Sequence, residues 1–181
     1  VDIPSSPILA MKKDDDGNIA IFTRYGNALY FYLVDENLQV LLTNYYDISG
    51  ISGKFVEYKD MVITDNKYIL YGYNIVVYDK EKDDFDIIDN PVIDMKVIDD
   101  VIYSYEQRET RYTYVYGTAF VEYDSNLNII QESSLPLMYS TTMFANGGAS
   151  GFTYIKNRAV FVKKDDKVDL ITLNSPINFS S

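Results

Sequence analysis

The sequence contains no cysteine and no histidine in its 181 residues. Without cysteine the chain cannot form disulfides or thiolate metal sites, although its compartment stays open because a secreted protein need not contain cysteine. Without histidine it lacks the commonest general base and the commonest metal ligand. Catalysis by Ser-His-Asp or Cys-His groups, and zinc or iron sites built on histidine, are therefore excluded. We predict no cofactor and no metal site.

Basic residues and long apolar runs are also scarce. The chain has 16 Lys and Arg against 27 Asp and Glu, which gives a net charge of −11. The field of such a surface repels a phosphate backbone, so no nucleic acid partner is expected. No apolar run approaches the roughly 18 residues of a transmembrane helix, so no membrane span is predicted. No signal peptide is visible, and the chain opens on Val1 rather than Met, as it would after removal of a leader or an upstream region.

The residues that are present favour β-structure. No apolar pattern of 3.6 residues continues over three helical turns. Val, Ile, Tyr, Phe and Thr dominate instead, with 18 Tyr, and these residues fit a pleated, half-buried surface. Short runs of them alternate with clusters of Asp, Asn, Gly, Lys and Pro, which is typical of an all-β protein with frequent turns.

One pattern of strand, polar turn and strand occurs four times. Its clearest copy is TAFVEYDSNLNIIQESSLP at residues 118–136, and the others begin at residues 28, 74 and 158. Asp35, Asp79 and Asp124 each follow the first strand of a copy, at spacings of 44 and 45 residues, and Lys164 takes the matching place in the fourth. The repeat predicts a single domain over residues 1–181 with units at about 8–50, 51–90, 91–135 and 136–175.

Each unit contains four strand-like runs. They are residues 8–13, 18–25, 28–34 and 38–44 in the first unit; 55–63, 67–72, 74–79 and 85–89 in the second; 92–98, 101–106, 113–123 and 127–132 in the third; and 137–145, 151–156, 158–164 and 167–173 in the fourth. Proline at 7, 91, 136 and 176, and Ser-Gly near position 50, are predicted to mark crossovers between units, because proline lacks a donor and glycine loosens the backbone. Four antiparallel strands every 40–45 residues is the period of a β-propeller blade.

Two stretches resemble known propeller repeats. Residues 16–21, DGNIAI, resemble the Asp-Gly-Asn turn of regulator-type propeller repeats, although Ala20 stands where that motif commonly has Trp. Residues 123–129, YDSNLNI, are similar to the outer hairpin of six-bladed propellers in bacterial envelope and sensor proteins. The resemblance covers about residues 8–177 and implies a propeller-like, all-β fold with four four-stranded antiparallel blades. It implies little about activity, because propellers host unrelated functions.

Four blades are fewer than most closed propellers have, and this leaves several arrangements open. Three arrangements agree with the sequence. The first is a piece of a larger propeller, the second is a small ring whose C-terminal strand completes the first sheet, and the third is an open array capped by a partner. Unpaired edges of an unclosed array favour association with another chain. The alternative fold is a β-sandwich, because strand spacing alone does not separate it from a propeller.

The third unit differs from the others by an insertion, EQRETRYTYVY, between Tyr105 and Gly117. Its predicted tip is residues 107–111, and continued strands would place alternate tyrosines on one face. Tyr and Arg anchor interfaces, since each joins a large contact area to a polar end. We predict a protein- or glycan-binding site here, unless the rings simply pack on the neighbouring sheet. Its residues are Tyr105, Gln107, Arg108, Arg111, Tyr112, Tyr114 and Tyr116.

Two other stretches have polar patterns for which a plain turn is the favoured interpretation. Residues 145–151, ANGGASG, lack the Lys-Ser/Thr that follows in a phosphate-binding loop. Asp14, Asp16 and Asn18 resemble half of a calcium loop, but the glutamate expected six residues after Gly17 is replaced by Thr23.

The composition therefore favours a non-catalytic binding or scaffold module, more in keeping with a binding protein than with an enzyme. A bacterial cell envelope or extracellular setting is favoured, and a virus particle is the other setting considered. The alternative is a carbohydrate-active hydrolase, which needs two converging acids. Acids near strand ends that would face a central channel are Glu57, Asp60, Asp94, Asp99 and Asp100.

Overall fold

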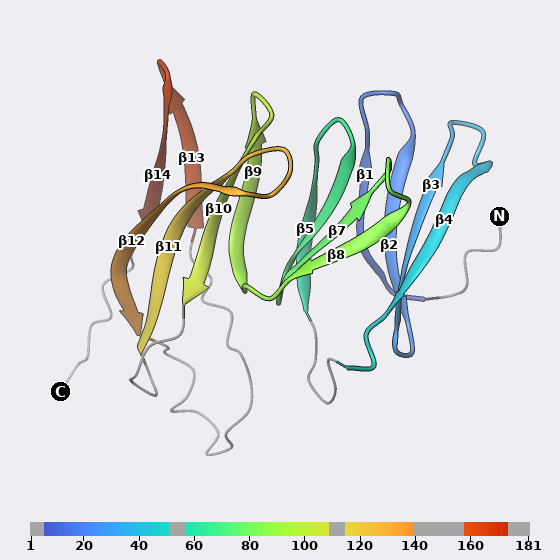
Figure 1. The fold of residues 1–181 in the computed structure, drawn as a ribbon, viewed down its shortest axis with the longest axis horizontal. Coiled ribbons are helices and arrows are strands. Elements are labelled where there is room, and N and C mark those ends of the chain that lie inside the picture. Colours follow the sequence, from blue (N-terminus) through green and yellow to red (C-terminus); the bar gives the residue numbers. More distant parts are fainter. Residues whose placement is uncertain (1–5, 51–56, 109–114, 140–157, 174–181) are drawn as a thin grey trace. The chain divides into compact units, whose positions relative to one another are not determined.

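A computed structural model describes residues 6–50, 57–108, 115–139 and 158–173, and every regular element in these ranges is a β-strand (Figure 1). The all-β prediction is confirmed. The chain divides into two compact units, Val1–Val92 and Ile93–Ser181, each described here by itself.

The first unit holds two four-stranded sheets. The first sheet contains β1 (Ile8–Lys13), β2 (Ile19–Tyr25), β3 (Ala28–Val34) and β4 (Val40–Asp47). The second contains β5 (Tyr58–Ile63), β6 (Lys67–Gly72), β7 (Ile75–Asp79) and β8 (Asp84–Ile88). Every neighbouring pair is antiparallel, and the strands follow one another in chain order.

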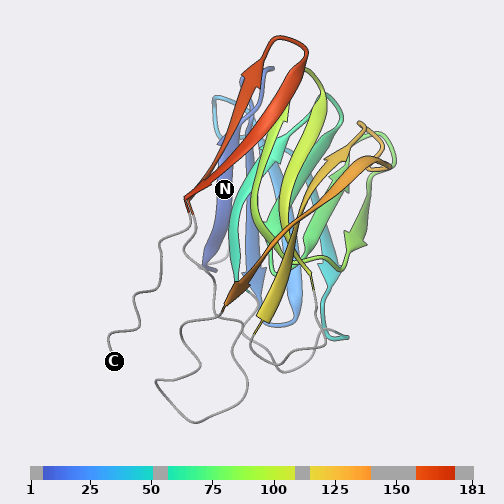
Figure 2. The ribbon, with the colours of Figure 1, turned by 90° about the vertical axis from the view of Figure 1, so that its left-hand side faces the viewer.

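The second unit repeats this arrangement. Its four-stranded sheet contains β9 (Val92–Ile98), β10 (Val101–Arg108), β11 (Val115–Tyr123) and β12 (Ile129–Tyr139), again in chain order. A hairpin of β13 (Arg158–Lys164) and β14 (Lys167–Leu173) follows. It lies against the sheet of β9–β12 (Figure 2). Each sheet is thus an open meander of consecutive strands, as predicted for a blade, whereas Greek-key connections in a sandwich carry the chain from one sheet to the other.

The observed strands follow the predicted runs closely. Six of them, β1, β3, β6, β9, β13 and β14, have the predicted bounds, and most others differ by one to three residues at an end. Of the fourth unit, residues 140–145 and 151–156 lie outside the described residues, so that unit is described only as a two-stranded hairpin.

The prediction that Pro136 ends a unit is wrong. Strand β12 continues through it to Tyr139, and the register with β11 shifts between Tyr116 and Thr118. Two residues of β12, Pro136 and Leu137, therefore stand opposite Gly117 alone. Proline is tolerated at such a position because β12 is an edge strand and a bulge releases the residue from the hydrogen-bond ladder.

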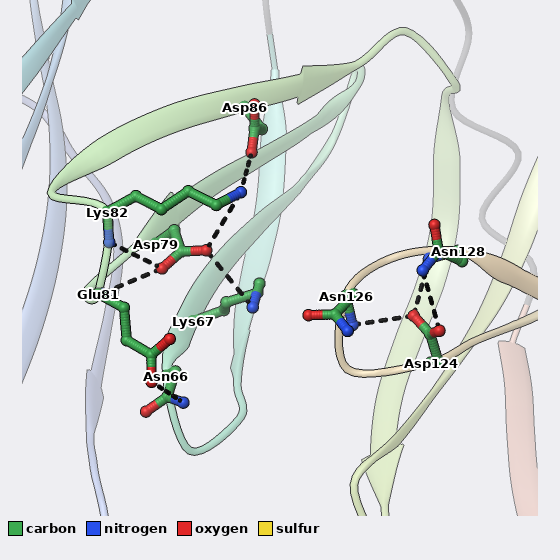
Figure 3. Close-up of polar contacts among 9 residues, drawn as sticks. All are labelled: Asn66, Lys67, Asp79, Glu81, Lys82, Asp86, Asp124, Asn126 and Asn128. Carbon is green, nitrogen blue, oxygen red and sulfur yellow. Dashed lines mark hydrogen bonds and ion pairs between the residues drawn. The ribbon is translucent and has the colours of Figure 1, made fainter.

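The repeated aspartate has a physical role that explains its period. The Asp35 carboxylate accepts hydrogen bonds from the backbone N–H groups of Asn37 and Gln39, at 2.9 and 2.8 Å. Asp124 repeats this geometry with Asn126 and Asn128, both at 2.9 Å (Figure 3). A short acidic side chain that bonds the backbone two residues on stabilises such a turn. The residue three after each aspartate, Leu38 or Leu127, adopts a positive φ that closes the turn.

The core of the first unit lies between its two sheets and is rich in aromatic rings. Phe31 on β3 is fully buried, and its ring centroid lies 5.1 Å from Phe22, 4.9 Å from Tyr68 and 4.3 Å from Tyr78. Buried tyrosines need partners for their hydroxyl groups. Tyr68 donates to Asp14 at 2.8 Å, which links β6 to the turn after β1.

Candidate functional site

The β10–β11 pair carries the predicted binding hairpin. Its register is regular as far as Arg108 opposite Gly117, so Gln107 and Arg108 lie within β10 rather than at a tip. The predicted tip is therefore wrong at its first two positions. Tyr116 lies in β11, where only its backbone is described. Arg111, Tyr112 and Tyr114 lie outside the described residues.

Tyr105 is buried in the core of the second unit, with 1% of its surface exposed. It packs in a cluster with Ile93 and with Phe161 from the β13–β14 hairpin. Side chains alternate along β10, so Tyr103 and Tyr105 share the face that meets this hairpin. In the described structure Tyr105 therefore holds sheets together and does not offer its ring at a surface.

The opposite face of the same strands holds a cluster of charges, which we call the Glu106 cluster. Glu106 is fully buried, and its carboxylate accepts hydrogen bonds from Arg108 Nη1 and from the Tyr123 hydroxyl, both at 2.5 Å. Arg108 also reaches Glu132 on β12, at 3.1 Å from both Nε and Nη2. The Glu106 cluster thus ties together three adjacent strands.

Two opposing effects act on the pKa of Arg108 in the Glu106 cluster. Burial by itself would lower the pKa of Arg108, but the hydrogen bond and charge of Glu106, with Glu132 adding to them, outweigh it and raise that pKa. The guanidinium thus stays charged between two carboxylates. The side chains of Arg108 and Glu132 are 27% and 38% exposed, so the cluster opens to solvent at that end and is closed at Glu106.

Sequence reasoning found Arg108 but missed the other three members of the Glu106 cluster, Glu106, Tyr123 and Glu132. The signal was the spacing of Glu106 and Arg108, because residues two apart in a strand share a face. Tyr123 and Glu132 could not be added from sequence, since their places depend on the registers of β10 with β11 and of β11 with β12.

A second charged cluster surrounds Asp79 at the end of β7 (Figure 3). Its carboxylate is 4% exposed and forms ion pairs with Lys67 at 3.5 Å and Lys82 at 3.7 Å. The backbone N–H groups of Glu81 and Lys82 also donate to it, at 3.0 and 3.2 Å. Burial opposes ionisation of Asp79, but these hydrogen bonds and Lys67 together lower its pKa below the ordinary 3.8.

Replacing Asp79 with asparagine is expected to lower the free energy of unfolding at pH 7 by about 1–2 kcal/mol, through loss of charge-assisted hydrogen bonds. A lowered folded-state pKa contributes stability that is present above the unfolded pKa and lost as pH falls through the folded one. The gap between wild type and D79N should therefore close below about pH 4. Urea unfolding at a series of pH values measures it. The matched control is Asp84→Asn, because Asp84 is exposed, and a gap that persists in acid would contradict the assignment.

The acids considered for a hydrolase do not form a described cluster. Glu57 and Asp60 belong to the first unit, and the other three belong to the second. Asp99 and Asp100 both adopt positive φ in the two-residue turn between β9 and β10, where Asp residues are favoured for conformational reasons. Asp99 is exposed and paired with Lys163, and Asp94 Oδ1 accepts the backbone N–H of Met95 at 2.9 Å.

The predicted resemblance to a calcium loop has a local explanation. Asp14 Oδ1 accepts the backbone N–H of Asn18 at 2.8 Å, and Asp14 Oδ2 accepts the hydroxyl of Tyr68. Asp16 forms an exposed ion pair with Lys80 at 3.8 Å. Within residues 6–50, 57–108, 115–139 and 158–173, no group of three or more acidic side chains is placed to hold a metal ion. The ANGGASG stretch lies outside these ranges.

Comparison with known protein families finds no family model that matches this chain, and comparison with curated proteins finds no match either. The structure defines the class of protein: an all-β chain whose described part forms three successive four-stranded antiparallel meanders and a two-stranded hairpin. Its assignment to propeller repeats stays a prediction from the sequence. In the described part of the chain there is no helix long and apolar enough to span a membrane.

Proposed function

We propose that the chain is a non-catalytic binding module that presents the connection between β10 and β11 to a protein or glycan partner. The observation that supports it is the position of the Glu106 cluster, which ties β10, β11 and β12 together beside the residues that lead into this connection. A contact segment that leaves from a rigid base loses less conformational entropy when it binds.

The residue types of the connection fit this role. Residues 109–114 read ETRYTY and contain Arg111, Tyr112 and Tyr114. Arg108 is already engaged with Glu106 and Glu132, so its main contribution is to hold the base. Arginine and tyrosine are the types most enriched among residues that dominate interface energies.

The test is a triple substitution of Arg111, Tyr112 and Tyr114 by alanine. The wild-type chain is screened on a printed panel of neutral and acidic oligosaccharides and against a random-peptide phage library, and the affinity of any selected ligand is measured by calorimetry. The triple variant should bind at least about 10-fold more weakly, since each anchoring side chain contributes on the order of 1 kcal/mol or more. Its thermal midpoint should shift by less than about 2 °C.

The matched control is Arg24→Ala with Tyr25→Ala, an Arg-Tyr pair at the end of β2 whose tyrosine is 65% exposed. This control should bind the selected ligand as the wild type does. Absence of a ligand in both screens, or unchanged affinity in the triple variant, would contradict the proposal.

The hydrolase alternative has no comparable support among the described residues. Glycoside hydrolysis uses two acids on either side of one bond, and one of them is generally held in an apolar environment. Asp99 and Asp100 are exposed turn residues instead. Release of new reducing ends from any oligosaccharide of the panel would reverse this conclusion.

A further inference from the structure

The repeats pack on one another by a constant rule. The four copies of the repeat align at Asp35, Asp79, Asp124 and Lys164. In each copy, we call the residue four positions before this aligned residue the forward residue. We call the residue three positions before the aligned residue the rear residue. Neighbouring positions of a strand point to opposite faces, so each sheet has a forward face and a rear face.

Two contacts illustrate the rule within the two units. The forward residue Phe31 of the first sheet lies in one core cluster with the rear residue Val76 of the second sheet. The forward residue Phe120 of the third sheet lies 6.1 Å, between ring centroids, from the rear residue Phe161 of the β13–β14 hairpin. In each unit, the forward face of one sheet receives the rear face of the next.

Within the first unit, the described residues offer the rear face of the first sheet no partner of this kind, and this face carries apolar side chains. Its rear residue is Tyr32, whose ring stacks on Tyr30 at 6.2 Å, and Tyr30 in turn lies 5.8 Å from Tyr45. Met11 and Tyr45 on the same face are 59% and 62% exposed. An apolar face of this kind marks an interaction surface.

The hairpin of β13 and β14 has the complementary surface. Val160, its forward residue, is paired with Ile171, and the two side chains are 54% and 52% exposed. Val162 on the same face is 37% exposed. Val160 stands at the repeat position that Phe31 and Phe120 occupy in sheets whose forward face packs on the next sheet.

We propose that two copies of this chain associate head to tail, with the forward face of the β13–β14 hairpin of one copy packed on the rear face of the first sheet of another. Val160 of one copy then contacts Tyr32 of the next, as Phe120 contacts Phe161 within the chain. The two surfaces differ, so the contact is heterologous and can continue from copy to copy. Because each copy carries a net charge of −11, added salt should strengthen association by screening repulsion.

The test uses two variants of the whole chain that each block one surface. The rear variant is Met11→Lys with Tyr45→Lys, and the forward variant is Val160→Lys with Ile171→Lys. Wild type should show a mass that rises with concentration in sedimentation velocity, and each variant alone should be a monomer. A mixture of the two should form a dimer of twice the monomer mass, because each variant keeps the surface that the other lacks.

The control variant is Leu38→Lys with Ile130→Lys, two residues 60% and 57% exposed that lie on neither surface. It should associate as the wild type does. If this variant is instead a monomer, the proposal is overturned, because added charge outside both surfaces would then be enough to prevent association. A wild type that stays monomeric at every concentration would also overturn it. So would a forward variant that still self-associates, since the contact would then join two identical surfaces.

The register of the contact can be tested chemically, because the chain has no cysteine of its own. Tyr32→Cys and Val160→Cys variants are mixed and treated with a short bismaleimide, since packed sheets stand about 10 Å apart, too far for a disulfide. A cross-linked pair in the mixture, absent from a mixture of Ile130→Cys with Val160→Cys, supports the proposed contact. A double variant that carries both Tyr32→Cys and Val160→Cys is treated in the same way. If its two cysteines are cross-linked only within one chain, the proposal is overturned, because the two surfaces would then meet within a single copy.

Discussion

Replacement of Phe31 by alanine is expected to lower the free energy of unfolding by about 3–5 kcal/mol, the usual cost of removing a fully buried phenylalanine. Phe31 is 0% exposed and lies within ring-contact distance of Phe22, Tyr68 and Tyr78. These rings come from both sheets of the first unit, so alanine would leave a cavity between two rigid layers. Such layers close only partly around a void, which adds a cavity cost to the loss of transfer free energy.

Urea unfolding followed by tyrosine fluorescence measures this loss. The variant Phe31→Leu, which keeps most of the volume, should cost about 1–2 kcal/mol. The control Tyr25→Ala removes a ring that is 65% exposed and should cost less than about 1 kcal/mol. If Phe31→Ala is no more destabilising than this control, the face-to-face core of the first unit is wrongly described.

Replacement of Arg108 by methionine has the second-largest expected effect, a loss of about 2–3 kcal/mol. Breaking a fully buried ion pair generally costs about 3–5 kcal/mol, because the remaining charge is left without a partner. Here the arginine is 27% exposed, so water can partly replace it and the expected loss is smaller. Glu106, with no exposed surface, would keep only the Tyr123 hydroxyl as a described donor.

A double-mutant cycle separates this effect from simple loss of packing. Glu106→Gln removes the charge that Arg108 neutralises, so the variant E106Q/R108M should be less destabilised than the sum of the two single variants. A matched control is Arg24→Met, since Arg24 makes a hydrogen bond of 3.2 Å to the carbonyl of Gly26, two residues away, and should lose less than about 0.5 kcal/mol. Strict additivity in the cycle would contradict the Glu106 cluster.

The strands were largely predictable because their signals are local. Alternating Val, Ile and Tyr runs specify extended backbone, and Asp35 and Asp124 form their turns with residues only two and four positions away. The failure at Pro136 has a tertiary reason. A proline interrupts a central strand but is accommodated at a bulge in an edge strand, and strand order alone decides which of these applies.

The candidate site was predicted less well, because its residue types do not reveal which face they occupy. Tyr105 and Arg108 were both chosen as interface residues, yet their side chains lie on opposite faces of β10. Tyr105 became part of the core, whereas Arg108 became the centre of a charge cluster. Neither position can be predicted from the sequence of β10 alone, because both depend on the strands and sheets that pack against it.

The sequence by itself determined the all-β class, the number of strands in each of the first three units and the aspartate turns between them, because hydrophobic alternation and turn chemistry act over a few residues. The tertiary structure alone decided which face of each sheet is covered, which charges are buried together and where an apolar face stays exposed. These features depend on registers between strands and on contacts between sheets, which join residues far apart in the chain.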